Sequence, residues 1–387
     1  MQVSRLSHPV SLMKDMAPLH PNGKEFAKSC NRKLICARWY IDEDNLSSMS
    51  KNEILSPRDV NGHGTHTATT AGGNIVHNAS CLGLATGTVR GGAPRARVAM
   101  YKACWSGGGC STADQLKAMD DDVHDGVDIL SLSIGGPFEN QGTLHVVAKG
   151  IPVVYAAGND GLIAQTVENS SPWLLTVAAA TIDRSFPVVI TLGNNDKEKC
   201  KPVQSDKTLH GRRLDYYNIT KATGEKGGKG VILPQYNTDL VLGDILLTLP
   251  IPCFVPVDYE ITYRIYQYKE NDGTPKVKIS FTRTTIGTEV SAPKVAVFSS
   301  RGPSPIYHGV LKPDIAAPGV SILAASPKTT FFEQAPYHFN SGTSMSCPHV
   351  SGIIAVLKSL HPQWSPAALK SAIMTTGKYY SFHKQHV

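Results

Sequence analysis

The sequence predicts an α/β protein built on a doubly wound parallel sheet. Apolar runs of strand length recur along the chain, and segments of helical length separate them. Strands that alternate with helices favour a parallel sheet covered by helices on both faces. With 41% hydrophobic and 18% charged residues, the composition is that of an ordinary globular protein, and no part of it argues for disorder.

Residues 1–40 show no clear hydrophobic period and are expected to be irregular. A helix rich in small residues is expected from Asn61 onward, and Ser111 has the position of an N-cap for the next one. The expected strands are 96–103, 127–134, 152–157 and 174–180, and the helices between them are 111–124 and 143–149. Strands this apolar are typical of a parallel sheet with both faces buried.

The pattern changes in the middle of the chain. Lys- and Gly-rich stretches and aromatic runs such as 259–268 predict an inserted β-rich module. The α/β pattern resumes at 293–298, and further helices are expected at 344–360 and after Ser365, which is followed by proline. The predicted division is 1–195, 196–286 and 287–387, with the first and third parts forming one domain.

Charge and hydropathy exclude several classes of protein. The net charge of +7 is spread over the chain and forms no concentrated basic face, so a nucleic-acid partner is not expected. No run of 18 apolar residues is present, so no membrane span is expected, and the first ten residues lack the apolar core of a signal peptide. No C-x₂-C pair suggests a zinc site, and no metal is expected.

Two features suit a secreted protein. Asn-x-Ser/Thr acceptor triplets occur at Asn45, Asn78, Asn169 and Asn218. Cys104 and Cys110 flank a Gly-rich loop that fits a disulfide, although two free buried thiols fit the spacing equally well.

Three motifs carry residues suited to acyl transfer. His63 lies at a helix start between glycines, which let a substrate backbone approach a general base. Ser344 precedes an apolar helix, whose dipole and N–H groups favour an alkoxide and an oxyanion. Asn159 follows a buried strand in a Gly turn and offers an amide donor. Taken singly, each has a structural explanation: a core histidine, a helix cap and a polar turn.

Other hydrolase classes fit these motifs poorly. A metalloprotease needs H-E-x-x-H, and no Glu lies between His63 and His66. An α/β-hydrolase needs G-x-S-x-G and an acidic residue after the serine. The string around Ser344 lacks the second glycine, and no Asp or Glu follows it.

Taken together, the motifs resemble the subtilase family of serine proteases, in its plant branch. The resemblance runs from about residue 11 to 377. The matching strings are NRKLI at 31–35, SPRD at 56–59, SSRGP at 299–303, LKPDIAAPG at 311–319 and GTSMSCPHV at 342–350.

The resemblance implies a subtilisin-like fold and a serine endopeptidase, with polypeptide substrates and no cofactor. His63 would be the general base, Ser344 the nucleophile and Asn159 the oxyanion-hole donor. The substrate-binding edge would be formed by Ser131, Ser133, Ile134, Gly135 and Gly136, where a peptide adds as a strand. The inserted module resembles a protease-associated domain, and the family implies secretion. The oligomeric state is not predicted.

The chain departs from the family at the catalytic aspartate. Subtilases place it after an apolar strand, in Asp-Thr/Ser-Gly, and no such string precedes His63; the upstream aspartates are Asp15, Asp42, Asp44 and Asp59. Loss of this aspartate in subtilisin lowers turnover by roughly four orders of magnitude. We expect a chain truncated at both ends relative to the family, with an unpaired gap in the sheet. The alternative function is therefore an inactive relative that at most binds peptides.

Overall fold

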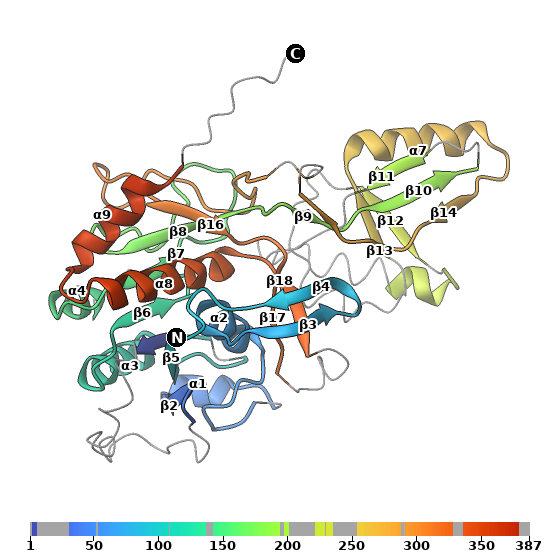
Figure 1. The fold of residues 1–387 in the computed structure, drawn as a ribbon. Coiled ribbons are helices and arrows are strands. Elements are labelled where there is room, and N and C mark those ends of the chain that lie inside the picture. Colours follow the sequence, from blue (N-terminus) through green and yellow to red (C-terminus); the bar gives the residue numbers. More distant parts are fainter. Residues whose placement is uncertain are drawn as a thin grey trace.

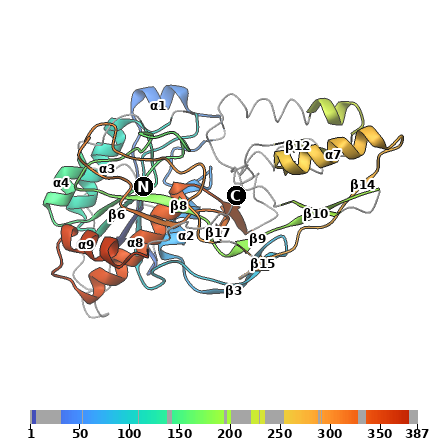
Figure 2. The ribbon, with the colours of Figure 1, turned by 90° about the horizontal axis from the view of Figure 1, so that it is seen from above.

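The computed structural model places a large α/β body beside a smaller one (Figures 1 and 2). It describes residues 2–5, 31–51, 53–107, 109–136, 142–193, 197–200, 221–228, 230–234, 254–287, 290, 292–327 and 336–378. Among the described residues, no helix is long and apolar enough to cross a membrane.

The large body is organised around a seven-stranded sheet in the order β16-β8-β7-β6-β1-β5-β2. The strands are β16 (Ile315–Pro318), β8 (Leu175–Ala180), β7 (Val153–Ala156), β6 (Ile129–Leu132), β1 (Gln2–Arg5), β5 (Arg97–Lys102) and β2 (Leu34–Trp39). Apart from β1, neighbouring strands are parallel. Every residue of β6, β7 and β8 is buried, which confirms the predicted two-sided burial.

The position between β5 and β6 is not an open gap. There β1 pairs antiparallel with both neighbours, with Val3 opposite Ala99 on one side and Leu130 on the other. Two expectations were therefore wrong: that residues 1–40 are wholly irregular, and that the sheet carries unpaired edges here. Backbone N–H and C=O groups pair in a ladder whatever their side chains are, so a segment without strand periodicity can fill this position.

Helices cover both faces of the sheet. They are α1 (Glu43–Ser48), α2 (His63–Gly72), α3 (Thr112–His124), α4 (Gly142–Ala148), α8 (Thr343–Leu360) and α9 (Pro366–Thr376). In β7, Val153 and Tyr155 share a core with α3 and α4, whereas Val154 and Ala156 share one with α8 and α9. Successive strand residues face opposite sides of a sheet, so the two cores confirm double winding.

Two helix starts were predicted from their caps. Ser111 Oγ accepts a hydrogen bond from Asp114 N at 3.1 Å, and Ser365 Oγ accepts one from Ala368 N at 3.2 Å. Each satisfies an N–H group that has no partner inside its helix.

Short antiparallel pairs of strands flank the sheet. They are β3 (Val76–Cys81) with β4 (Leu84–Val89), β9 (Arg184–Ser185) with β15 (Thr285–Ile286), and β17 (Ile322–Ala325) with β18 (Tyr337–Asn340). At 293–298, where the α/β pattern was expected to resume, Val295 forms only an isolated bridge with Ala180.

The smaller body combines two sheets with helix α7 and a short helical segment at 221–225. Its elements are β10 (Val188–Leu192), β11 (Lys197–Cys200), β12 (Val231–Pro234), β13 (Phe254–Val257), α7 (Tyr259–Asn271) and β14 (Val277–Ile279). Because β10 pairs with β11 and β14, the packing of this body begins before residue 196.

The run at 259–268 is a helix, so the β-type expectation for it was wrong. Asp258 caps α7 by accepting a hydrogen bond from Ile261 N at 2.8 Å. Ile261, Ile265 and Tyr268 face the small core at a spacing of four and then three residues. That spacing is helical, and it overrides the strand preference of the tyrosines and isoleucines.

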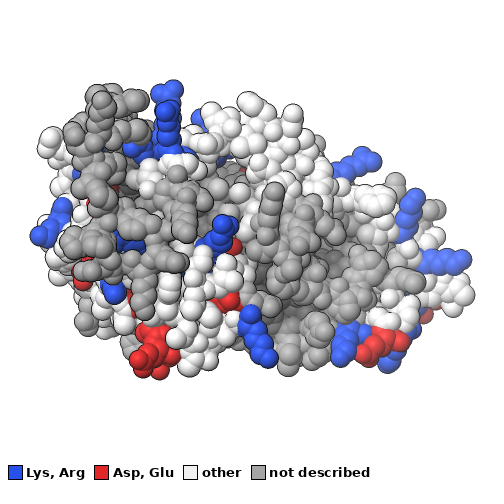
Figure 3. Space-filling model, turned by 90° about the horizontal axis from the view of Figure 1, so that it is seen from below, with Lys and Arg blue, Asp and Glu red and all other residues white. Residues whose placement is uncertain are grey.

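Two further features of the surface and of the cysteines relate to the sequence predictions: the distribution of basic side chains and the state of Cys104 and Cys110. Lys and Arg side chains lie singly, without gathering into one patch, on the face of the described chain shown in Figure 3. Cys104 and Cys110 form a disulfide, which settles the two possibilities left open by their spacing.

Candidate active site

His63 is the first residue of α2, and the turn before it is fixed by Asp59. The Asp59 carboxylate accepts hydrogen bonds from Gly62 N at 2.8 Å and Thr65 N at 2.6 Å, and from Thr65 Oγ1 at 2.7 Å. Gly62 has φ +95°, a conformation that favours glycine. Asp59 therefore satisfies N–H groups at the start of α2, whose N-cap residue is Gly62.

Ser344 lies in the first turn of α8, next to the loop that follows β6. Ser133 Oγ donates to the Ser344 carbonyl at 2.7 Å, and Ser344 Oγ lies 3.5 Å from the Ser133 carbonyl. The first N–H groups of a helix have no intrahelical acceptor, and the helix dipole is positive at this end. An 18-residue helix thus places its positive end at the Ser344 hydroxyl.

The orientation of the Asn159 amide is set by Thr343. Asn159 Oδ1 accepts hydrogen bonds from Thr343 N at 2.9 Å and from Thr343 Oγ1 at 3.0 Å. Thr343 Oγ1 in turn accepts one from Gly158 N at 3.2 Å. These bonds hold the amide with its oxygen toward Thr343 at the start of α8. Thr343, which sequence reasoning did not single out, is therefore a positioning residue for this amide.

A single cleft of about 590 Å³ brings the predicted residues together. All eight line it: His63, Ser131, Ser133, Ile134, Gly135, Gly136, Asn159 and Ser344. They come from the start of α2, the ends of β6 and β7 and the start of α8. Loops at the carboxyl ends of parallel strands are where α/β sheets bind ligands.

A residue that the sequence marked only as a glycosylation triplet holds the cleft wall together. Asn169 Nδ2 donates to the Ile134 carbonyl at 3.0 Å and the Ala156 carbonyl at 2.8 Å. The Asn169 carbonyl accepts a hydrogen bond from Thr176 Oγ1 at 2.7 Å. One side chain thus connects the ends of β6 and β7, and its 8% exposure leaves no room for a glycan.

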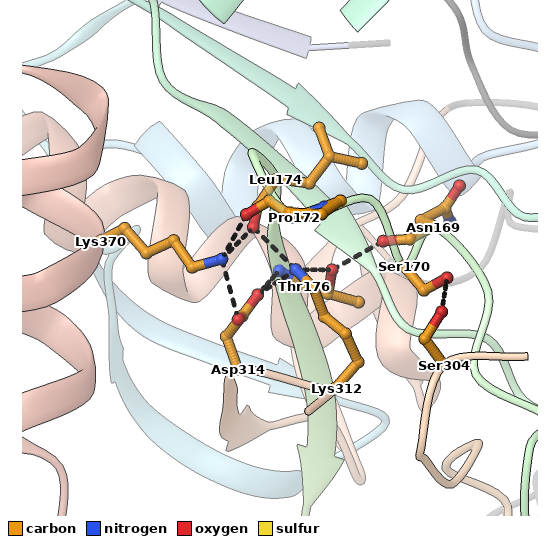
Figure 4. Close-up of polar contacts among 9 residues, drawn as sticks. All are labelled: Asn169, Ser170, Pro172, Leu174, Thr176, Ser304, Lys312, Asp314 and Lys370. Carbon is orange, nitrogen blue, oxygen red and sulfur yellow. Dashed lines mark hydrogen bonds and ion pairs between the residues drawn. The ribbon is translucent and has the colours of Figure 1, made fainter. Parts of the chain in front are cut away.

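Behind this wall lies a buried cluster of charges, drawn in Figure 4. Lys312 Nζ pairs with Asp314 at 2.6 Å and donates to the Leu174 carbonyl at 2.8 Å and Thr176 Oγ1 at 3.0 Å. Lys370, from α9, pairs with the other Asp314 oxygen at 2.9 Å. Burial lowers the pKa of Lys312 to about 8, although Asp314 acts in the opposite direction. The cluster joins β8, β16 and α9.

Two nearby residues with reactive side chains are structural. His66 is fully buried, its Nε2 lies 2.9 Å from the Ile322 carbonyl, and burial holds its pKa well below the usual range. Cys347 is also fully buried, and burial raises the pKa of its thiol to about 11. The proximity of Cys347 to Ser344 in sequence therefore does not make it accessible in the cleft.

The catalytic carboxylate expected from the resemblance has no counterpart in β1, because none of the residues from Gln2 to Arg5 is Asp or Glu. Asp59, which also lines the cleft, is engaged with α2. In the described part of the chain, no group of three or more His, Cys, Asp or Glu side chains is arranged to hold a metal ion.

Comparison with known proteins places these observations in a family. A model of the Subtilase family matches residues 18–386. Subtilisin-like protease SBT3.7 of Arabidopsis thaliana is 45% identical over 92% of this chain and 53% of its own length. Subtilisin-like protease SBT3.13 of the same plant is 47% identical over 90% of this chain and 50% of its own length. The chain thus spans about half the length of the curated relatives it matches.

Among solved structures, Sphericase is 21% identical, with a TM-score of 0.43 over 83% of this chain and 71% of that one. That superposition is too loose to bear on the site. The family match and the plant relatives agree with the resemblance in the motifs. The chain belongs to the subtilase family.

Proposed function

We propose that this chain is the catalytic part of a serine endopeptidase that hydrolyses polypeptides through an acyl-enzyme. The observation that carries the proposal is the shared cleft, in which a histidine, a serine and an oriented amide meet beside a strand end. Membership of the subtilase family supports it.

In the proposed reaction, Ser344 Oγ attacks the scissile carbonyl carbon while His63 takes its proton. Asn159 Nδ2 and the backbone N–H groups of the first turn of α8 stabilise the oxyanion. The C–N bond then breaks as His63 protonates the leaving amine. In the second half, His63 takes a proton from water, the resulting hydroxide attacks the acyl carbon, and His63 returns the proton to Ser344 Oγ as the ester bond breaks. The amide orientation that Thr343 imposes supports the role of Asn159.

The peptide would bind along the end of β6 and the segment that follows it, where Ser131, Ser133, Ile134, Gly135 and Gly136 would form the edge to which a strand adds. Gly136 has open space where a side chain would stand, so a neighbouring chain can approach this backbone. We further propose that the smaller body is a protease-associated domain inserted in the catalytic one, and that the protein is secreted. The Cys104–Cys110 disulfide supports an oxidising compartment.

A second candidate function is peptide binding without turnover. The specific observation that favours it is β1, which occupies the sheet position next to β5 and β6 and contains no carboxylate. Without a carboxylate at His63, the imidazolium formed in the first step would lose its main stabilisation.

The test is covalent labelling of the purified chain with a fluorophosphonate probe. Labelling that disappears in Ser344→Ala would support a working nucleophile and base. A chain that is folded by near-UV circular dichroism but takes no label at Ser344 would exclude the endopeptidase and leave the peptide-binding function.

A further inference from the structure

Two acidic side chains line the cleft of the proposed nucleophile without a mechanistic role. Asp160 directly follows Asn159, and Glu168 lies in the polar segment between β7 and β8. Both line the cleft that contains Ser344. Sequence reasoning missed Glu168, because nothing in its local pattern shows that the chain returns to the cleft there.

The Glu168 carboxylate lies directly against the proposed peptide-binding edge. Glu168 Oε2 accepts a hydrogen bond from Gly136 N at 3.0 Å. A Cβ added to Gly135 would overlap the same carboxylate, and one added to Gly158 would lie 3.0 Å from Glu168 Cδ. The carboxylate therefore sits between the turns after β6 and β7, where only glycines leave it room.

The two acidic groups interact with each other. Burial raises the pKa of Glu168 to about 7, and the nearby charge of Asp160 acts in the same direction. Above about pH 7, Glu168 therefore adds a negative charge to a partly buried wall.

No cation of the protein neutralises this pair, as far as the chain is described. The other charged or histidine side chains lining the cleft are Glu53, Asp59, His63 and Lys102. Lys102 is engaged with Glu53 at 2.8 Å, and none of the ion pairs among the described residues includes Asp160 or Glu168. A partly buried carboxylate pair without a cation favours a ligand that brings one.

The wall that carries Glu168 is rigid. Glu168 N donates to the Ala157 carbonyl at 2.9 Å, and Asp160 N donates to Ser300 Oγ at 2.9 Å. The next residue, Asn169, ties the ends of β6 and β7 together and is supported by the buried charge cluster of Figure 4. A carboxylate held in this way loses little entropy when it binds a ligand.

We propose that Glu168, with Asp160 beside it, selects polypeptides that place an arginine or lysine side chain against this wall, next to the scissile bond. A guanidinium group offers paired N–H donors that match a carboxylate. The inference rests on the proposed function for its peptide-binding edge, and it adds the class of substrate.

The experiment measures binding, so that it does not depend on turnover. Ser344→Ala chain is titrated against two fluorescein-labelled peptides that differ only in arginine or citrulline, a neutral side chain of nearly the same shape, and binding is followed by fluorescence anisotropy. At pH 8 we expect the arginine peptide to bind at least about tenfold tighter, the scale of one charge-assisted hydrogen bond. Glu168→Gln, made in the same background, is expected to remove most of that preference.

The pH dependence provides a second readout. Because the pKa of Glu168 is raised to about 7, the preference for arginine should grow between pH 6 and pH 8 and stay flat in Glu168→Gln. The other groups of the cleft, His63 included, face both peptides alike, so taking the ratio of the two affinities removes their contribution.

The outcomes separate the two proposals. Equal affinity for the two peptides would overturn the inference about Glu168 and leave peptide binding intact. Binding of neither peptide by the folded chain would overturn both. The comparison of arginine with citrulline uses the parent Ser344→Ala chain, so it remains decisive even if Glu168→Gln fails to fold.

Discussion

Replacing Asp122 with alanine is expected to stabilise the protein. Asp122 lies on α3 and is fully buried, and neither carboxylate oxygen has a hydrogen-bond partner in the described structure. Burial raises the pKa of Asp122 well above its usual value; the charges of Asp125 and Asp121 act in the same direction, and the positive charges nearby, Arg38 among them, act against it. The folded state therefore favours the protonated form of this acid, at a buried position where neither oxygen has a partner among the described residues.

The expected gain has two parts. A buried polar group without a partner costs about 1–3 kcal/mol, and alanine adds roughly 0.5 kcal/mol of helix propensity over aspartate. This part does not depend on pH. The second part depends on pH, because the Asp122 carboxyl ionises near pH 4 in the unfolded chain and has a raised pKa in the folded one.

The sign of the pH dependence follows from the proton count. Above the pKa of the unfolded state, the folded state binds more protons, so its stability falls as pH rises toward the folded pKa. The slope is about 1.4 kcal/mol per pH unit over that interval. The advantage of Asp122→Ala should therefore be smallest at or below pH 4 and should increase toward neutral pH.

The assay is thermal unfolding followed by circular dichroism at pH 4, 5.5 and 7. At about 2–4 °C per kcal/mol for a domain of this size, the midpoint at pH 7 should rise by about 5 °C or more. The matched control is Asp120→Ala, on the same helix but exposed, which should gain only the helix propensity. If Asp122→Ala lowers the midpoint, or raises it no more than the control does, the carboxyl group has a favourable partner and the reasoning fails.

Other residues give further predictions. Thr343→Val removes one of the two donors that orient Asn159 and should slow fluorophosphonate labelling by about 3–10-fold, with no change in the circular dichroism; an unchanged rate would refute the positioning role. Lys312→Met should lower the unfolding free energy in urea by about 3 kcal/mol, because Asp314 and two further acceptors lose a buried donor. Peptide mapping of secreted protein should find glycan at the exposed Asn78 and none at the buried acceptors Asn45 and Asn169. Iodoacetamide should modify Cys347 only after unfolding, whereas modification of the folded chain would contradict its burial.

The parts of the fold predicted best are those with strong local patterns. The apolar runs of β5, β6, β7 and β8 have the length and composition of buried parallel strands, and Ser111 and Ser365 mark their helices by a cap. In α7 the composition was misleading, because tyrosine and isoleucine favour strands. There the spacing of Ile261, Ile265 and Tyr268 was the better guide.

The residues of the site also fall into two groups, those that the sequence predicted and those that only the structure places in the cleft. His63, Asn159 and Ser344 belong to strings whose combination is specific enough to identify a family, so sequence alone pointed to them. Glu168 and Asn169 belong to no such string, and their positions depend on how the segment after β7 folds back across two strand ends. Contacts between distant segments leave no period in one sequence, which is why these residues emerge only from the structure.

The strand β1 shows why a folded sheet does not by itself imply a working protease. Its place between β5 and β6 needs backbone N–H and C=O groups, which any non-proline residue supplies, and Gln2–Arg5 supplies them in the antiparallel direction. Catalysis has a further requirement, because His63 needs a nearby carboxylate to stabilise its charged form. The sheet and the peptide-binding wall can therefore be complete while turnover is lost. This is why binding by Ser344→Ala and labelling of Ser344 have to be measured separately: the first tests the wall that Glu168 belongs to, and the second tests the environment of His63.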